Sequence, residues 1–192
     1  MSKTIALVCG AKNCAEKAFR DYFKDRDVEI VKTDSLLEAS ECDLCVLDGY
    51  SGHLSQQMLE CTQFLNIHYS LLPAFDCRNP VEEAFKTGVK VTGVTLSLLD
   101  DDGTKGRIIA QYPVFVDFFT TIDELEDELG KVVQKLAPFV AKSVLEDKVF
   151  SYAELLSNQG GCSGSCSGGC SCSDEQDRAC LLYTSPSPRD RG

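Results

Sequence analysis

Short apolar runs alternate with amphipathic segments over the first half of the chain. Four runs have the length and composition of buried strands, namely residues 3–9, 28–31, 43–47 and 64–68. Apolar residues recurring at helical spacing predict a helix over 13–25, and a short helix is predicted over 55–61. Strands that alternate with helices in this way predict an α/β fold: a Rossmann-like, open, mostly parallel sheet flanked by helices in a single domain.

The second half continues with elements whose ends the sequence marks. These are a helix over 80–87, strands at 89–99 and 107–116, and a helix from 121 to about 145. Pro80 suits the first turn of its helix, and Gly88 suits the position after the end. Thr121 and Glu124 make a capping box that starts the last helix, and Pro138 is expected to kink or restart it.

The composition changes sharply late in the chain. Residues 1–157 form the predicted α/β domain, whereas 158–179 are rich in Gly, Ser and Cys and are expected to be a flexible tail. The segment Cys180–Asp190 looks like a translated transposase sequencing adaptor, so residues 180–192 are interpreted as an artefact. A natural Ser-Pro-rich tail is the alternative. On the adaptor interpretation, the natural C-terminus was lost at or near Ala179.

Charge and hydropathy limit the partners. The 192 residues carry 19 Lys and Arg against 30 Asp and Glu, a formal net charge of −11. This argues against non-specific nucleic-acid binding, because an acidic surface repels phosphate. No apolar run reaches the ~18 residues of a membrane span, and the first residues lack the apolar stretch of a signal peptide. We therefore expect a cytoplasmic protein that acts on small molecules, with its oligomeric state left open.

The eleven cysteines fall into a body group and a tail group. Those of the body are expected to be free thiols in a reducing cytosol, mostly as small core residues. Cys42 and Cys45 form a C-x-x-C pattern, but within a predicted strand, which favours buried thiols over a redox pair. Four tail cysteines have the spacing to hold zinc or an iron–sulfur cluster, beside the alternative of a disordered tail: Cys162, Cys166, Cys170 and Cys172.

The segment Asn66-Ile-His68-Tyr-Ser-Leu-Leu-Pro73 ends a predicted strand and carries the sharpest chemistry. Asn66 and His68 lie two residues apart and so point to the same side of the strand, at the edge where open α/β sheets bind ligands. His68 can act as a general acid or base, and Asn66 offers an amide donor. From spacing alone, a structural role for both residues is the favoured interpretation.

This segment resembles the signature of the folate-dependent formyltransferases. The resemblance extends over Ala84-Phe-Lys-Thr-Gly-Val-Lys-Val-Thr-Gly-Val-Thr95 and Gly106-Arg-Ile-Ile-Ala-Gln-Tyr-Pro-Val114, and is strongest to the glycinamide ribonucleotide formyltransferases. It implies formyl transfer from 10-formyl-tetrahydrofolate to an amine in purine biosynthesis. In this family the charge that develops on the formyl oxygen would be stabilised by Asn66 and by protonated His68.

The family's catalytic aspartate has no direct counterpart. An ungapped alignment places Thr104 there, and a threonine cannot balance the charge of His68. Asp102 could replace it if the loop bends differently, although a solvated acidic turn is an equally good interpretation of this segment. Val133 and Gln134 stand where the family has a substrate-contacting Glu-His pair.

Two further sets of site residues follow from the resemblance. The folate pocket is expected at Ser51, Gly52, His53, Leu54, Leu98, Leu99, Asp100 and Asp101. The substrate's phosphate is expected at a loop that ends on a helix N-terminus, formed by Gly10, Ala11, Lys12 and Asn13. A plain strand-to-helix turn is an equally good interpretation of that loop.

Two hypotheses of different classes remain. The first is a folate-dependent formyltransferase, supported by Asn66, His68 and the Ser-Leu-Leu-Pro that follows them. The second is a catalytically degenerate formyltransferase fold that binds folate or a nucleotide, linked to metal or redox sensing through the cysteine tail. Thr104 and Val133 favour the second hypothesis.

Overall fold

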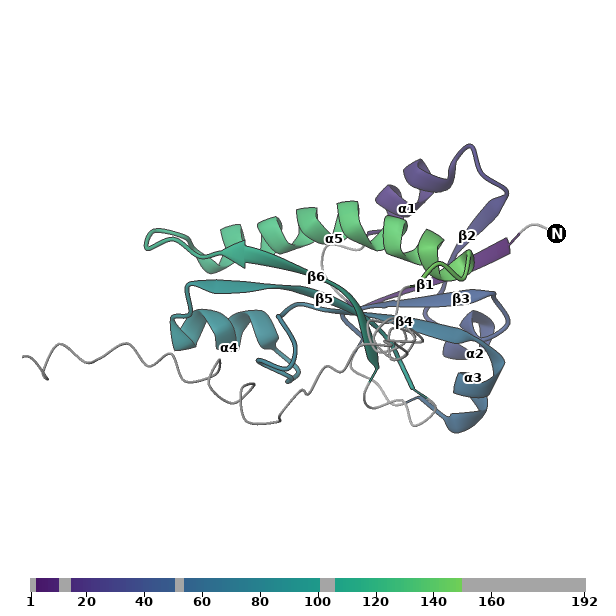
Figure 1. The fold of residues 1–192 in the computed structure, drawn as a ribbon, viewed down its shortest axis with the longest axis horizontal. Coiled ribbons are helices and arrows are strands. Elements are labelled where there is room, and N and C mark those ends of the chain that lie inside the picture. The colour runs from purple at the N-terminus through teal and green to yellow at the C-terminus, as the bar shows by residue number, and fades with distance from the viewer. Residues whose placement is uncertain (1–2, 11–14, 51–53, 101–105, 150–192) are drawn as a thin grey trace, which may run out of the picture. The chain divides into compact units, whose positions relative to one another are not determined.

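The computed structural model describes residues 3–10, 15–50, 54–100 and 106–149, and within them a six-stranded sheet forms the centre of the fold (Figure 1). Its strand order is β2-β1-β3-β4-β5-β6. The strands are β1 (Lys3–Cys9), β2 (Val28–Lys32), β3 (Leu44–Asp48), β4 (Gln63–His68), β5 (Val91–Leu98) and β6 (Arg107–Phe115). The first four in spatial order are parallel, and β5 and β6 extend the sheet antiparallel. The predicted α/β class is therefore confirmed as a mixed sheet.

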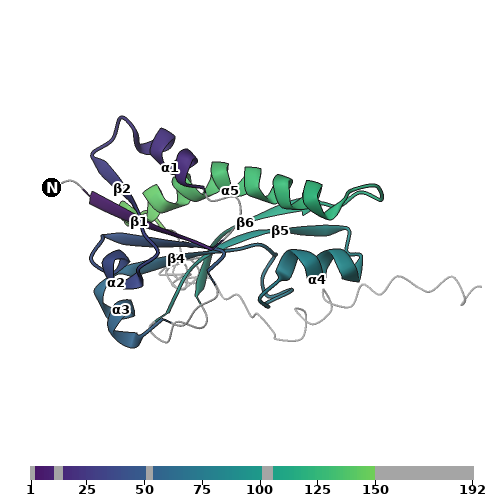
Figure 2. The same cartoon turned by 180° about the vertical axis from the view of Figure 1, so that it is seen from behind.

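Helices cover both faces of this sheet. Figure 1, and Figure 2 from behind, show α1 and α5 on one face and α2 and α3 on the other. The helices are α1 (Glu16–Phe23), α2 (Leu36–Ala39), α3 (Gln56–Cys61), α4 (Pro80–Thr87) and α5 (Ile122–Leu145). Every residue of β3 is buried, as expected for a central strand covered on both faces. The carboxyl ends of β1, β3 and β4 consequently share one edge of the sheet.

The long helix α5 supplies most of the covering apolar surface. Its capping box is present, because Thr121 Oγ1 accepts from Glu124 N at 3.3 Å and Glu124 Oε2 accepts from Thr121 N at 2.8 Å. Val133 is fully buried against the sheet. The helix continues through Pro138 to Leu145, so of the two expected outcomes a restart at Pro138 is contradicted. Packing of both flanking turns into the core outweighs the lost backbone bond.

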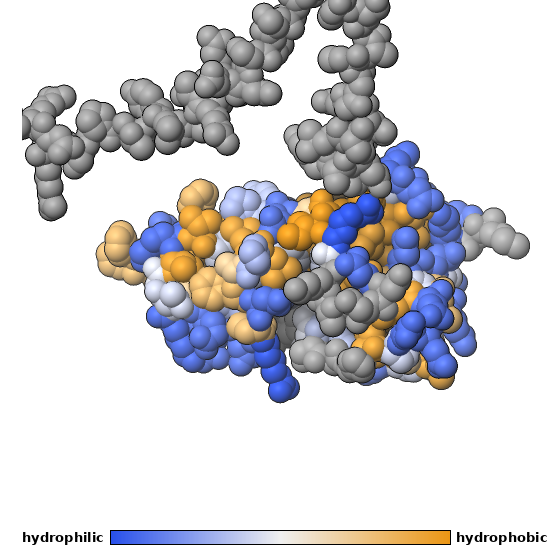
Figure 3. Space-filling view, turned by 60° about the horizontal axis from the view of Figure 1, so that its bottom comes forward, coloured by the Kyte–Doolittle hydropathy of each residue, from blue (hydrophilic) through white to orange (hydrophobic). Residues whose placement is uncertain are grey.

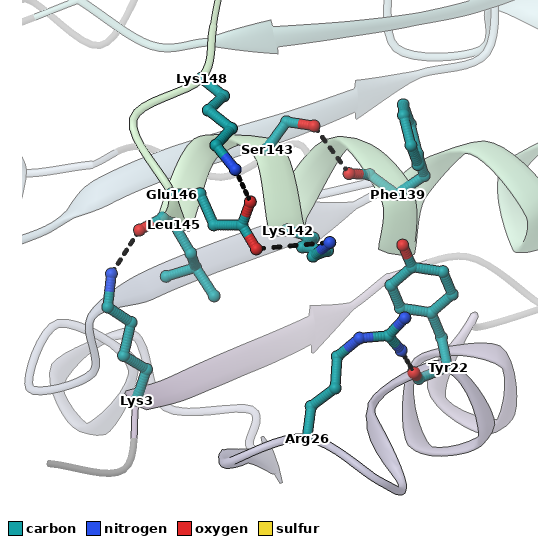
Figure 4. A network of polar contacts seen from close by, with 9 residues as sticks. All are labelled: Lys3, Tyr22, Arg26, Phe139, Lys142, Ser143, Leu145, Glu146 and Lys148. Atoms are coloured by element: carbon teal, nitrogen blue, oxygen red, sulfur yellow. Dashed lines mark hydrogen bonds and ion pairs between the residues drawn. The ribbon is translucent and has the colours of Figure 1, made fainter.

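The carboxyl end of α5 is tied to the start of the chain (Figure 4). Lys3 Nζ donates to the carbonyl oxygen of Leu145. Glu146 pairs with Lys142 at 3.3 Å and with Lys148 at 2.8 Å. Cations near the last turn of a helix interact favourably with its exposed carbonyls. The Lys3 bond therefore joins the end of α5 to the start of β1, whereas the Glu146 pairs lie within the end of α5 and the residues after it.

The surface carries several large exposed side chains. β6 is an edge strand, and Phe115, Phe118 and Phe119, at or just after its end, are 72%, 88% and 94% exposed. Figure 3 shows one face on which hydrophobic residues gather towards the middle between hydrophilic ones. No described helix carries an apolar stretch long enough to cross a bilayer.

The body cysteines match the expectation only in part. Cys42, Cys45, Cys61 and Cys77 are free thiols, but Cys42 is half-buried and Cys61 and Cys77 are exposed, so the expectation of mostly core cysteines was wrong for the described thiols. Cys45 is completely buried, and burial raises its pKa to about 12, so it is an inert strand thiol as predicted. Cys9 is disulfide-bonded, which contradicts the expectation of a free thiol at that position. That expectation rested on the redox compartment and took no account of which sulfur atoms the fold brings together.

Candidate active site

The carboxyl ends of three parallel strands surround a pocket of about 410 Å³. Gly10 follows β1, Gly49 and Tyr50 follow β3, and Asn66 and His68 end β4. The other lining residues are Ile67, Tyr69, Cys77, Arg78, Asn79, Pro80, Val81, Glu82, Glu126 and Gly130. A crevice outside the carboxyl ends of the strands is the usual ligand site of an open α/β sheet, and the predicted pair lies in it.

Gly10 allows the ends of β1 and β3 to approach closely. A Cβ atom at this position would lie 2.6 Å from the carbonyl oxygen of Gly49, which is closer than real Cβ contacts. The Gly10 N–H donates to the backbone oxygen of Asp48 at 2.8 Å. The floor of the pocket is therefore made of closely packed backbone.

Asn66 and His68 are both half-buried and both line the pocket. His68 Nε2 lies 3.0 Å from the carbonyl oxygen of Phe75. Because a carbonyl only accepts, Nε2 carries a hydrogen in this arrangement, which leaves Nδ1 as the nitrogen free to exchange a proton. In the part of the chain that the structure describes, the Asn66 side chain makes no hydrogen bond, so its amide can serve a ligand.

The loop that bears the Phe75 carbonyl is held by a network of hydrogen bonds. Thr95, fully buried on β5, donates from Oγ1 to Ser70 O at 2.7 Å and accepts from Leu72 N at 3.0 Å. Gln111 Nε2 donates to Thr95 Oγ1 at 3.0 Å and to Leu72 O at 2.9 Å. Ser70 Oγ donates to Ala74 O at 2.6 Å. This network positions the carbonyl that orients His68.

The buried Asp48 and the half-buried Tyr69 form a hydrogen-bonded pair beside the carboxyl end of β4. Asp48 is 2% exposed, and its Oδ1 accepts from the Tyr69 hydroxyl at 2.7 Å. Its Oδ2 accepts from Ala15 N, just before α1, at 3.3 Å. Burial raises the pKa of Asp48, and the two hydrogen bonds act in the opposite direction. Burial, followed by the neighbouring Asp48, raises the pKa of Tyr69.

Several of these residues were missed by the sequence analysis. Asp48 could have been found as the one acidic residue ending a fully apolar strand, a position that needs buried hydrogen-bond donors. Nothing local to Thr95 marks it, since its partners lie 16 to 25 residues away in the chain. Arg78, Glu82 and Glu126 reach the pocket from or next to α4 and α5, where helical spacing gives no sign of a ligand.

The predicted folate residues are only partly described. Leu54 and Leu99 belong to one apolar cluster on the α2–α3 face of the sheet, together with Phe64. The Leu99 N–H donates to Phe64 O at 3.0 Å. On β5, Thr95 pairs with His68, and Leu98 pairs with Leu65, nearer the amino end of β4. The segment Leu98–Asp100 therefore lies towards the amino end of β4 and not opposite His68. Ser51, Gly52, His53 and Asp101 lie outside the described residues.

The remaining predicted site residues lie largely outside the described part of the chain. Of the phosphate loop, Gly10 lines the pocket, whereas Ala11, Lys12 and Asn13 fall outside it, as do Asp102 and Thr104. Asp100 is exposed. The tail residues Cys162, Cys166, Cys170 and Cys172 are likewise outside, and the described residues contain no group of three His, Cys, Asp or Glu side chains that could hold a metal. The boundaries at 157 and 179 stay predictions.

Comparisons with known proteins agree with this architecture. The phosphoribosylglycinamide formyltransferase of Bacillus subtilis (strain 168) is 36% identical over 111 residues, which are 57% of this chain and 57% of that protein. The chain thus spans little more than half of that relative. Two solved structures share the fold. Glycinamide ribonucleotide transformylase 1 from Symbiobacterium toebii has a TM-score of 0.64 at 24% identity, covering 79% of this chain and 92% of that one. A 4-N formyltransferase from Francisella tularensis has a TM-score of 0.66 at 17% identity, covering 78% and 72%.

The family assignment rests on most of the described domain. Residues 3–140 match the family described as formyl transferase. This range contains all six strands, the Asn66–His68 pair and most of α5. The chain therefore belongs to the formyl transferase family.

Proposed function

We propose that this protein transfers a formyl group from 10-formyl-tetrahydrofolate to the amine of glycinamide ribonucleotide, a step of purine biosynthesis. The observation that carries the proposal is the placement of Asn66 and His68, side by side at the end of β4, in the pocket at the carboxyl edge of the sheet. The likeness to the Bacillus subtilis formyltransferase supports this choice of acceptor.

The residues present suit the binding of an activated formyl group. When bound, the donor would supply a formyl carbonyl that the acceptor amine can attack; the formyl C–N bond of the donor would then break, and the tetrahydrofolate nitrogen would leave with the proton that the amine gives up. The Asn66 amide, with no competing bond among the described residues, donates to the carbonyl oxygen as negative charge develops there. His68 keeps Nε2–H on the Phe75 carbonyl and uses Nδ1 either to stabilise that charge, when protonated, or to accept the amine proton.

The carboxylate that balances the charge of His68 is assigned to Asp102, with Thr104 at the aligned position. The acidic run at residues 100–102 supports this assignment, since one bend of the loop would present a carboxylate in place of the threonine. A carboxylate near an imidazole favours the charged form of the ring. Asp102→Asn should therefore lower the rate of formyl transfer, whereas Thr104→Val should leave it close to the wild-type value.

Formyl transfer to glycinamide ribonucleotide, measured with wild type and His68→Ala, tests the proposal. Removal of a general acid or base is expected to lower kcat about 10²- to 10⁴-fold. Asp43→Asn, at the opposite end of the parallel strands, is the matched control and should retain wild-type activity. Equal rates for wild type and His68→Ala, with folate binding intact in both, would instead support the degenerate binding module.

A further inference from the structure

The carbonyl that faces His68 belongs to a residue in an unusual backbone conformation. Phe75 has a φ of 55°, in the left-handed region that residues other than glycine rarely adopt. Its carbonyl oxygen lies 3.0 Å from His68 Nε2 and also accepts from Cys77 N at 2.9 Å. Such a conformation persists only where the surrounding structure imposes it, and it is common at active sites. The position of this carbonyl therefore depends on what holds its loop.

The loop at residues 70–75 is attached to the antiparallel strand β5. Leu71 packs directly on Gly93, because a Cβ atom added to that glycine would lie 2.7 Å from Leu71 Cδ2. One residue further along the loop, Leu72 N donates to Thr95 Oγ1 at 3.0 Å. The loop is therefore seated on β5 by one apolar contact and by hydrogen bonds to a buried hydroxyl.

Gln111 of β6 is the second attachment of this loop to the sheet. Its Nε2 donates one hydrogen to Leu72 O at 2.9 Å and the other to Thr95 Oγ1 at 3.0 Å. The Thr95 hydroxyl thereby accepts twice and donates once, which is its full capacity. Gln111 is exposed, lies on an edge strand and does not line the pocket. It therefore acts on the site through the loop that it holds.

We propose that Gln111 is a positioning residue for formyl transfer: by fixing the loop at residues 70–75, it keeps the Phe75 carbonyl on His68 Nε2–H. The imidazole ring is then held in one orientation, with Nδ1 as the nitrogen that takes part in the reaction. This inference rests on the proposed formyl transfer and adds to it a residue of β6, outside the pocket. Without the Gln111 amide, the loop loses its attachment to β6, and the ring of His68 loses its fixed partner.

Gln111→Met, which keeps the length of the side chain and removes its donors, tests this role by kinetics. We expect kcat to fall about ten- to a hundredfold, the cost of a slightly misplaced reacting group. The KM values for donor and acceptor should stay near those of wild type, because Gln111 does not line the pocket. Gln63→Met is the matched control, since the exposed Gln63 side chain makes no hydrogen bond to the described residues, and it should keep wild-type kinetics. Gln111→Glu, which also lacks the donors, should reproduce the loss and replaces Gln111→Met if that variant does not fold.

An NMR signal separates this inference from the proposed function, because it requires no substrate. The chain has two histidines, so the Nε2–H proton of His68 can be assigned by its absence from His68→Ala. We expect this proton to be protected from exchange with water in wild type and to exchange about tenfold faster in Gln111→Met. Equal protection in the two proteins, or a wild-type kcat for Gln111→Met, would overturn the inference. If wild type transfers no formyl group, the proposed function fails and proton exchange alone decides.

Discussion

The two ends of β3 carry the same hydrogen-bonding arrangement in opposite surroundings. At the amino end, the exposed Asp43 accepts from Thr4 N at 2.6 Å and from Thr4 Oγ1 at 3.0 Å. At the carboxyl end, the buried Asp48 accepts from a backbone N–H and the Tyr69 hydroxyl. The bonds from Thr4 lower the pKa of Asp43, whereas burial raises that of Asp48.

The difference shows how the same side chain can be screened by water at one edge of the sheet and shielded from it at the other. Water screens Asp43, so its bonds join β1 to β3 without affecting any ligand. Asp48 is 2% exposed, so its charge is poorly screened by water. Function accordingly gathers at the carboxyl edge, and substitutions at the two edges should differ in kind.

Asn66→Ala, at the carboxyl edge of the sheet, is expected to have the largest effect of these substitutions, and that effect should be on kcat. Loss of a donor to a developing negative charge should lower kcat about 10²- to 10³-fold. The thermal midpoint should stay near that of wild type, because the described structure shows no hydrogen bond from this side chain. Steady-state kinetics and thermal unfolding measure the two effects. Wild-type activity in Asn66→Ala would contradict the role proposed for the Asn66 amide in formyl transfer.

Thr95→Val is expected to have the next largest effect, on stability. The substitution leaves Ser70 O and Leu72 N, both partners of the buried hydroxyl, without their bond. Such losses cost about 1–3 kcal/mol, measurable by urea unfolding. Thr92→Val on the same strand is the matched control, since its buried Oγ1 has no partner in the described residues, and it should be neutral or stabilising. Equal destabilisation by both substitutions would contradict the role assigned to Thr95.

The smallest expected effect is on the pH dependence of stability, to which the carboxylates at the two ends of β3 should contribute with opposite signs. Because the pKa of Asp48 is raised from 3.8, its charge destabilises the fold as pH rises above that value. Because the pKa of Asp43 is lowered from 3.8, its charge stabilises the fold above that value, and this contribution is lost as pH falls through the lowered pKa.

Thermal midpoints between pH 3 and 7 test this contrast. Relative to wild type, Asp48→Asn should gain stability as pH rises, whereas Asp43→Asn should lose it. The Asp43 effect should be the smaller, because exposed charges are screened, and each kcal/mol corresponds to about 2–4 °C. Parallel pH profiles for the two variants would refute the assignment of opposite burial effects.

The elements were predictable wherever a local rule applies. The apolar run of β3 and the capping box of α5 depend on neighbours within a few residues, and both were predicted correctly. The four-residue helix α2 was not predicted, because its one local signal is the bond from Glu38 N to Ser35 Oγ. At Pro138 the local rule left a kink and a restart open, whereas the helix is continuous there and ends at Leu145 as predicted.

The sequence alone determined the α/β class, the strand that carries Asn66 and His68, and the resemblance that the formyl transferase match confirmed. Only the tertiary structure decided that Asp48 binds both ends of the β1–α1 loop, that Tyr69 fixes it, and that Thr95 holds the loop facing His68. The physical reason is range. Period and capping act within a turn or a strand, whereas hydrogen bonds between residues 21 to 33 positions apart exist only once the sheet brings its strand ends together.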